Sequence, residues 1–503
     1  MPTTNSPARS YSAEKLEVEA VEYATSPKST TSPPPPLTPE QEKRLWRKVD
    51  RRILPILTIM YLCSFLDRGN AKIQGLTDQL NLTGNKYNIA LTMYFVPYCL
   101  CECPANLVLK KFKPSRMPVL TRLQLLWGVI MTLMGLVKTY PQLVGTRICL
   151  GITEAGLFPG VVYYLTLWYP RHMLQYRVGL FYGGATIAGA FSGILAYGIS
   201  FMSGTAGLLG WSWIFILEGI ATVVVGASPS SCKLNAHSGS PVDFPDTATF
   251  LTPEEREYII WKKVKYDNSS VGEEEHFQIR HIKAAFMDWQ VWLQIMVYFA
   301  VITPLYGISL FLPFGYDTAI SELLTVPPYI CATIVLLIFA TWSDHVKLRS
   351  PFVLAGLVMC MIGFAINIAD VPVGVKYFGT FFCVSGSYAA FPGIIAWLGN
   401  NLAGQYKRGV GMALHIGIGN FGGAIASNIY LSKDAPRYVL GHALELMFVG
   451  IGFIFLPITV LAYKRANALR DKQQQEMEEK GIKYSVEELR RLGDRAPDFR
   501  YTL

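Results

Sequence analysis

The stretch RICLGITEAGLFPG, residues 147–160, decides the fold, because it places charged and helix-breaking residues inside an otherwise apolar segment. Arg147 and Glu154 lie seven residues apart, and the triplet Phe-Pro-Gly follows at 158–160. The same triplet recurs at 391–393, an offset of 233 residues. This recurrence indicates that the chain contains two copies of one helical unit.

The composition excludes an ordinary soluble protein. Hydrophobic residues make up 51% of the 503 residues, only 16% are charged, and the mean hydropathy is +0.29. Apolar runs of about 17–25 residues, long enough to cross about 30 Å of hydrocarbon as helix, recur along the chain. They predict an all-α membrane protein with twelve transmembrane helices, near 52–68, 87–109, 117–137, 142–168, 177–201, 211–227, 289–312, 322–343, 351–369, 376–398, 408–430 and 441–463.

Further repeats support two parallel halves of six helices each. SRMP at 115–118 matches LRSP at 348–351, again 233 residues apart, and the segments LTPEQEKRLWRKV and LTPEEREYIIWKKV precede spans one and seven. In these segments Thr38 with Gln41, and Thr252 with Glu255, predict capping boxes. Two such halves are typical of carriers that work by alternating access. The predicted divisions are a disordered cytoplasmic tail (1–37), the first half (38–227), a cytoplasmic linker (228–288), the second half (289–463) and a cytoplasmic tail (464–503).

The basic residues predict the orientation in the membrane. Lys and Arg cluster before span one, in alternate connections and after span twelve, so both termini are expected to face the cytoplasm. This topology accounts for the net charge of +9 without a nucleic-acid partner. The sequon at Asn81 falls on an outside loop and predicts glycosylation there. The nine cysteines have no metal-type spacing and no nucleophile motif occurs, so we expect neither an enzyme nor a metal or cofactor.

Charged residues inside the spans are the candidate functional residues. Asp67 and Arg68 lie near the outer end of span one, and Arg147 and Glu154 share one face of span four, about 10.5 Å apart along the axis. An arginine suits a carboxylate substrate, and a buried carboxylate such as Glu154 or Asp67 suits a proton. A static network between helices remains the alternative. The second half is expected to carry almost no charge within its spans.

Other residues are weaker candidates. Tyr94 could stack on a planar ligand, and His415 and Asn420 lie on a helix expected to line the central path, although packing explains such residues equally well. Pro159 and Pro392 are expected to break or bend spans four and ten and to act as hinges. Three further charged residues of the first half, in spans two, three and six, are less favoured: Glu102, Arg122 and Glu218.

Several motifs resemble one family of carriers: FLDR at 65–68, PANLVLKKFKPSR at 104–116, TEAGLFPGVVYYLTLWYPR at 153–171, DFPDTATFLT at 243–252 and LTVPPY at 324–329. Together they look like the fungal anion:cation symporter family of the major facilitator superfamily, which includes allantoate and nicotinate permeases. The resemblance covers roughly residues 40–470. It implies proton-coupled uptake of a carboxylate such as nicotinate, allantoate or pantothenate across a fungal plasma membrane by a functional monomer. Asp67, Arg68, Arg147 and Glu154 match charged positions used by related organic-anion carriers.

The function expected from sequence is therefore a proton-driven importer of a small organic anion. An exporter of an acidic metabolite and a nutrient sensor that does not transport are the alternatives. The chain departs from the family pattern after Arg68, where it is three residues short, at the end of span six from Ala227 to Val242, and after Pro313. These departures leave open an impaired paralogue or misplaced exon boundaries.

Overall fold

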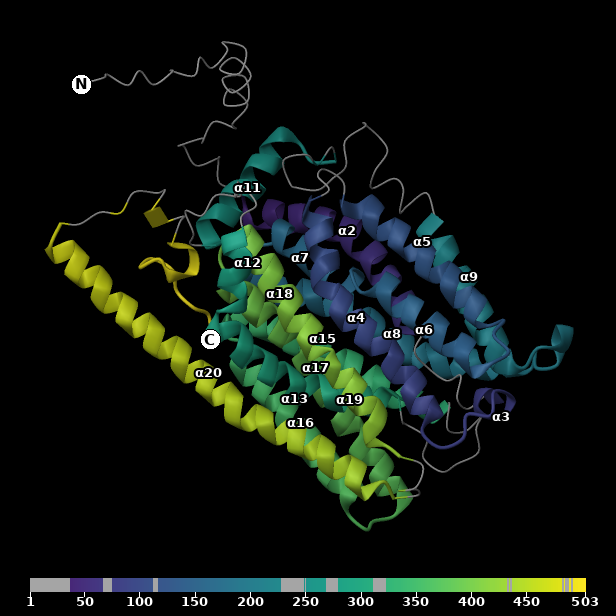
Figure 1. The fold of residues 1–503 in the computed structure, drawn as a ribbon. Coiled ribbons are helices and arrows are strands. Elements are labelled where there is room, and N and C mark those ends of the chain that lie inside the picture. Colours follow the sequence, from purple (N-terminus) through teal and green to yellow (C-terminus); the bar gives the residue numbers. More distant parts are fainter. Residues whose placement is uncertain are drawn as a thin grey trace, which may run out of the picture.

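The computed structural model describes residues 37–66, 75–111, 116–227, 248, 250–267, 279–310, 323–431, 434, 437–481, 484, 488–489 and 492–503. These residues form a bundle of helices, with the first half of the chain beside the second (Figure 1). The helices of the first half are α2 (Pro39–Leu66), α3 (Thr77–Gln79), α4 (Lys86–Lys111), α5 (Arg116–Met134), α6 (Tyr140–Glu154), α7 (Leu157–Trp168), α8 (Leu174–Ser200) and α9 (Gly210–Ala227). Those that follow are α11 (Pro253–Asp267), α12 (Ile279–Phe286), α13 (Trp289–Leu310), α15 (Val326–Val346), α16 (Ser350–Ile368), α17 (Val373–Asn401), α18 (Gln405–Gly419), α19 (Phe421–Ile429) and α20 (Val439–Glu479).

The predicted spans coincide with these helices. Within the described residues, nine helical stretches are long and apolar enough to cross a membrane, counting α6 with α7 and α18 with α19 as one stretch each. The remaining predicted spans, one to three, coincide with α2, α4 and α5. The all-α membrane fold expected from the apolar runs is confirmed.

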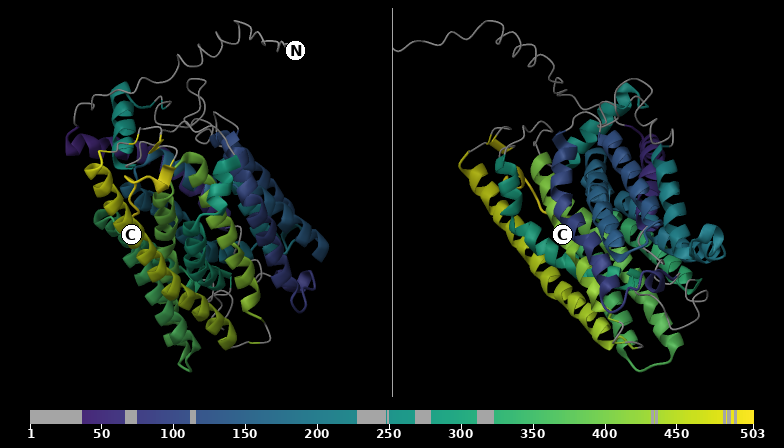
Figure 2. Two further views of the ribbon diagram at one scale, coloured as in Figure 1. Left: turned by 60° about the vertical axis from the view of Figure 1, so that its left-hand side comes forward. Right: turned by 45° about the vertical axis from the view of Figure 1, so that its right-hand side comes forward.

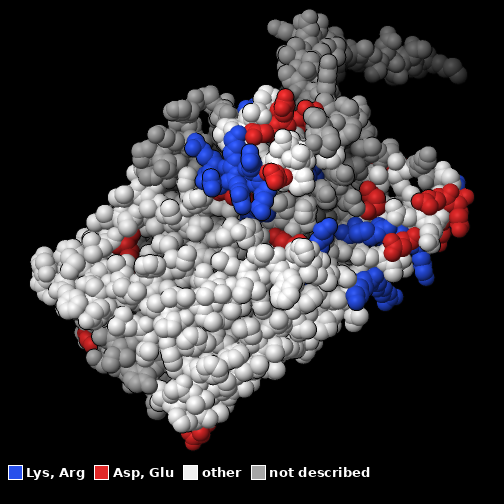
Figure 3. All heavy atoms as spheres, turned by 180° about the vertical axis from the view of Figure 1, so that it is seen from behind, with Lys and Arg blue, Asp and Glu red and all other residues white. Residues whose placement is uncertain are grey.

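The surface is divided as a membrane protein requires. Figure 3 shows Lys and Arg gathered toward one end of the molecule, next to a broad face without charge. Large apolar side chains are exposed on the bundle, among them Leu100, Phe201 and Leu461. Such a surface is unfavourable in water and favourable in lipid. We call the end that carries Lys48, Arg177, Arg349 and Lys407 the basic end.

Both predicted capping boxes form. The backbone N–H of Thr38 donates to Gln41 Oε1 at 2.9 Å, and that of Gln41 to Thr38 Oγ1 at 3.3 Å. The pair of Thr252 and Glu255 makes the same reciprocal bonds at 2.9 and 3.2 Å. The two repeated segments also contact each other, because Lys48 of α2 binds Glu255 of α11 at 2.7 Å.

Two of the predicted spans are interrupted near their middle. Between α6 and α7 the helix breaks at residues 155–156, and Pro159 follows in the first turn of α7. The ring of a proline clashes with the carbonyl four residues earlier, here residue 155, and its nitrogen donates no hydrogen bond. By contrast, α17 runs without interruption through Pro392. A break that the sequence did not predict separates α18 from α19 at Asn420.

The last described segment, residues 492–503, packs against the basic end of the second half. Asp494 accepts hydrogen bonds from Lys407 and Gln290, and the Trp397 indole donates to the carbonyl of Thr502 at 2.8 Å. The backbone N–H of Arg349 donates to the main-chain oxygen of Leu503 at 2.6 Å. This part of the predicted C-terminal tail is therefore docked on the bundle, as the yellow segment in Figure 2 shows.

Candidate functional site

Glu154 lies at the end of α6, beside the helix break, and its carboxyl group is held by two hydroxyls. It is 1% exposed. Ser64 of α2 donates to Oε1, and Tyr94 of α4 donates to Oε2 at 2.6 Å. The carboxyl thus joins three helices of the first half. A hydroxyl can donate or accept, so the same pair can hold Glu154 ionised or protonated.

Arg147 lies almost two turns from Glu154 on the same helix. It is 5% exposed, and its guanidinium carbon is 5.5 Å from the centre of the Phe215 ring on α9, a cation–π contact. The guanidinium thus contacts α9, whereas the carboxyl of Glu154 contacts α2 and α4, in keeping with the predicted separation of the two charges. A buried guanidinium is suited to bind a carboxylate when the surrounding helices move.

A second polar cluster joins the two halves. Asn420, at the break between α18 and α19, donates from Nδ2 to Glu102 Oε2 of α4 at 3.4 Å. The side-chain Oδ1 of Asn420 accepts a hydrogen bond from the Tyr298 hydroxyl of α13 at 3.3 Å. All three side chains are buried. Glu102 therefore contacts the opposite half through Asn420, a role that spacing along the sequence did not distinguish.

His415 is held inside the second half. It is fully buried, its Nε2 lies 3.1 Å from the carbonyl oxygen of Gln294, and its ring meets Tyr298 edge-on at 4.8 Å. Through Tyr298 it adjoins Asn420. The substrate contacts predicted for His415 and Asn420 remain predictions, and both residues lie in this one cluster.

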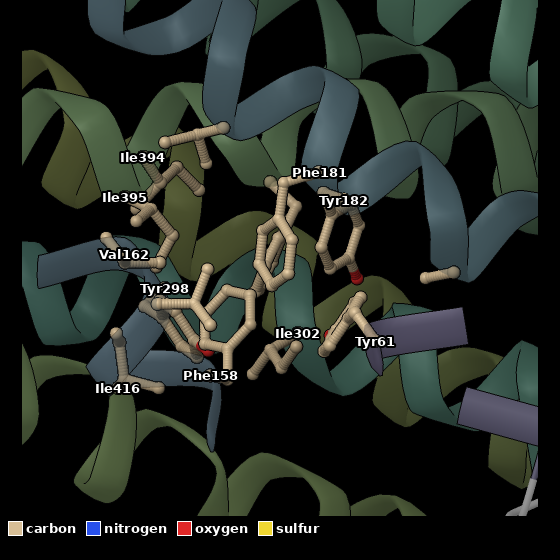
Figure 4. Packing of buried hydrophobic residues seen from close by; sticks show 14 of the residues in the cluster. Tyr61, Phe158, Val162, Phe181, Tyr182, Tyr298, Ile302, Ile394, Ile395 and Ile416 are labelled. Carbon is tan, nitrogen blue, oxygen red and sulfur yellow. The ribbon is translucent and has the colours of Figure 1, made fainter. Parts of the chain in front are cut away.

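Aromatic side chains fill the centre between the halves (Figure 4). Phe158 and Phe391, the first residues of the two Phe-Pro-Gly triplets, face each other with ring centres 5.7 Å apart. Tyr182 stacks on Phe391 at 4.3 Å, and Tyr61 packs against Phe158 at 5.3 Å. The repeated triplet thus brings equivalent residues of the two halves together, a contact that the repeat alone did not predict.

The halves also touch at both ends of the bundle. At the basic end, the backbone N–H of Tyr176 in α8 donates to Asp344 Oδ2 of α15 at 2.7 Å. At the opposite end, Asn428 of α19 donates to Thr92 Oγ1 of α4 at 2.8 Å. These contacts join the described residues of the two halves at both ends of the bundle, with the aromatic centre between them.

The remaining predicted residues are placed as follows. Asp67 and Arg68 lie outside the described residues, as do the three departures from the family pattern, apart from Ala227. Tyr94 binds Glu154 and packs between Phe95 and Tyr98, with ring centres 5.1 and 5.7 Å away. Asn81 is exposed, in the connection before α4.

The second half is expected to carry almost no charge within its spans, and the structure places one buried acid there. Glu445 lies in α20 and is fully buried. The sequence does not single it out, because one acid near the start of a long apolar helix resembles an interfacial residue. Ser64 and Tyr298 were also missed, since serine and tyrosine are common in packed membrane helices.

The fold defines a class of protein: a polytopic membrane protein whose two halves lie side by side as bundles of helices (Figure 1). The Major Facilitator Superfamily model matches residues 57–427. An uncharacterized transporter from Schizosaccharomyces pombe, C11D3.18C, is 33% identical, with 93% of this chain and 91% of the relative covered. The high-affinity nicotinic acid transporter of Saccharomyces cerevisiae is 30% identical, with 96% of this chain and 89% of that protein covered.

The solved structures agree on the fold. The xylose transporter XylE from E. coli, in a partially occluded inward-open conformation, superposes with a TM-score of 0.58 at 14% identity, covering 80% of this chain and 97% of that one. The chain belongs to the major facilitator superfamily. It is a multi-pass membrane transporter.

Proposed function

We propose that the protein imports a small organic anion together with a proton. The observation that carries this proposal is the buried carboxyl of Glu154, held by the hydroxyls of Ser64 and Tyr94 beside the helix break. Because hydroxyls can donate or accept, Glu154 can take up and release a proton when the hydrogen of one of the two hydroxyls turns, with the side chains in place. Asp67 is proposed as a further proton site.

Binding of the anion follows from the charges nearby. Arg147 lies on the same helix as Glu154, and a carboxylate bound by Arg147 or Arg68 would favour a proton on Glu154 by repulsion between like charges. Substrate and proton would then bind together. No cofactor is needed, since the proton gradient supplies the free energy.

The substrate class is proposed from two features. The central rings of Tyr61, Phe158, Tyr182 and Phe391 offer faces on which a planar ring can stack once the halves separate. One relative is named as a nicotinic acid transporter. We therefore place nicotinate first among the candidate carboxylates, ahead of allantoate and pantothenate.

Alternating access would arise from movement between the halves. The contacts of Tyr176 with Asp344, and of Thr92 with Asn428, lie at opposite ends of the bundle and would be broken in turn. On this proposal the basic end faces the cytoplasm of a fungal cell, the protein resides in the plasma membrane with both termini inside, and the monomer is the working unit.

Uptake of labelled nicotinate, allantoate and pantothenate tests the proposal. The protein is expressed in yeast without its own permeases, surface delivery is verified, and uptake is compared at acidic and neutral outside pH. We expect uptake of one anion that rises at acidic pH, is lost in Glu154→Gln, and is retained in Glu254→Gln, an exposed acid on α11. Export of an anion, or binding without flux, would contradict import.

A further inference from the structure

Glu445 is a buried acid that the central site does not use. It lies in α20, is fully buried, and neither carboxyl oxygen has a hydrogen-bond partner among the described residues. Its carboxyl group rests against the backbone of Gly307 on α13, so closely that a Cβ at Gly307 would overlap Oε1. An ionised carboxylate without a donor is strongly disfavoured in such a place, whereas the neutral acid is tolerated.

The groups around Glu445 leave it without a compensating cation. Three groups interact electrostatically with its carboxyl group: the thiol of Cys360 on α16, the thiol of Cys383 on α17 and the phenol of Tyr430 after α19. Gly307 of α13 offers no side chain, and His442 lies one turn away on α20. Permanent cations are absent from this set of described neighbours.

A metal ion does not fit this environment. Sodium, calcium and magnesium need several oxygen ligands. Within the described part of the chain, no group of three or more His, Cys, Asp or Glu residues could hold a metal. The ligand that needs only one carboxyl group is a proton.

A polar pair lies between Glu445 and the end of the bundle opposite the basic end. Helix α20 begins at Val439, so Glu445 lies only about 9 Å along the axis from its first residue. His442, half-buried between the two, has its Nδ1 3.1 Å from the Tyr430 hydroxyl. The Tyr430 ring in turn abuts Gly307, where the carboxyl of Glu445 rests.

We infer that Glu445 is a further proton-binding site, in the second half of the bundle, reached from the end opposite the basic end through His442 and Tyr430. The inference rests on the proposed proton coupling of transport. A proton bound at Glu445 neutralises the carboxylate, so the closed second half then buries no net charge there. Loss of the proton leaves a buried negative charge that favours opening to water. Proton sites would then lie in both halves, at Glu154 and Asp67 in the first and at Glu445 in the second.

Infrared difference spectroscopy on the purified full-length protein tests the inference without any substrate. Spectra are recorded between acidic and alkaline buffer, in the region of the carbonyl stretch of a protonated carboxylic acid. We expect a band that titrates and is absent in Glu445→Gln, a variant of the same shape. Asp370→Asn, an exposed acid near the same end, should retain it. Tyr430→Phe should retain the band, and the acid of Glu445 should exchange its proton with solvent more slowly than in the parent.

A spectrum of Glu445→Gln identical to that of the parent would overturn the inference, as would a band that persists unchanged up to alkaline pH, since a permanently neutral acid carries no proton in transport. Nicotinate uptake by the same variants separates this result from the proposed function. Loss of the pH dependence of uptake in Glu445→Gln, with surface delivery retained, supports the proton site at Glu445. Uptake in Glu445→Gln with the parent's pH dependence contradicts it and leaves Glu154 as the proposed coupling site.

Discussion

Asp344 joins the two halves at the basic end by accepting a hydrogen bond from the first turn of a helix in the other half. Its carboxylate accepts from the Tyr176 N–H, the third residue of α8, at 2.7 Å, and is paired within its own half with Arg349 at 2.6 Å. The side chain is only 12% exposed. On the proposed alternating access, opening of the basic end would break the bond to Tyr176 and leave the pair with Arg349 intact.

The size of the effect of Asp344→Asn follows from the bond to Tyr176 alone, because the pair with Arg349 lies within one half. The variant keeps an oxygen acceptor of the same shape, so the bond to Tyr176 changes from charge-assisted, worth about 1.5–3 kcal/mol, to neutral, worth about 0.5–1.5 kcal/mol. The carboxylate also loses a favourable interaction of about 0.3–1 kcal/mol with the helix dipole of α8. The closed arrangement should weaken by about 1.3–2.5 kcal/mol, a shift of roughly tenfold to sixtyfold toward the open basic end.

Distances between spin labels at two exposed positions, Arg51 of α2 and Thr341 of α15, measure the open and closed populations. Asp50→Asn is the matched control, because Asp50 binds Arg177 within the first half, with Nη2 3.1 Å from Oδ2. Asp50→Asn should lower stability and leave the open population unchanged. A ratio of open to closed that stays within twofold in Asp344→Asn, or that rises equally in Asp50→Asn, would refute the reasoning.

Three further predictions concern packing, the contact between the halves and the docked tail. Gly151→Ala should destabilise the protein by about 1–3 kcal/mol, because the new Cβ would overlap the carbonyl oxygen of residue 94. Gly145 lies on the same helix with open space around it, so Gly145→Ala should leave the stability unchanged or raise it. Thermal unfolding temperatures of the two variants test the difference. Asn420→Ala removes the hydrogen bond from Asn420 to Glu102 and should weaken the closed state by about 1 kcal/mol. The distances between the same two spin labels report this shift. Unchanged distances would contradict the contact between the halves. Burial, together with the nearby carboxyl group of Asp494, raises the pKa of Tyr501 to about 12, above its ordinary value near 10. Docking of residues 492–503 should therefore be complete below pH 10 and weaken as the pH rises from about 10 through 12. Proteolysis of the tail measures docking, and Tyr501→Phe should show no change over that range.

The spans and their caps could be predicted because they depend on local properties. Apolar runs long enough to cross a bilayer must be helical, since only helices satisfy their own backbone there. The capping boxes at Thr38 and Thr252 depend on residues three apart, and the break before Pro159 on one missing donor. The repeat of the Phe-Pro-Gly triplet indicated two related halves.

The contacts between helices could not be predicted from the same patterns. Glu102 and Asn420 are 318 residues apart, and their meeting depends on the rotation of each helix about its axis. In a membrane protein this rotation is poorly encoded, because the faces toward lipid and toward protein are both apolar. The contact of Phe158 with Phe391, and the burial of Glu445, depend on it in the same way.

Proton movement by the purified protein tests the central claim most directly. Proteoliposomes loaded with a pH-sensitive dye receive an inward gradient of nicotinate, with no imposed pH gradient. Import of nicotinate with a proton through Glu154 predicts that the lumen becomes acidic with the parent protein and with Glu254→Gln, and that Glu154→Gln abolishes this change. Nicotinate entry without acidification in the parent, or acidification that persists in Glu154→Gln, would contradict proton coupling at Glu154.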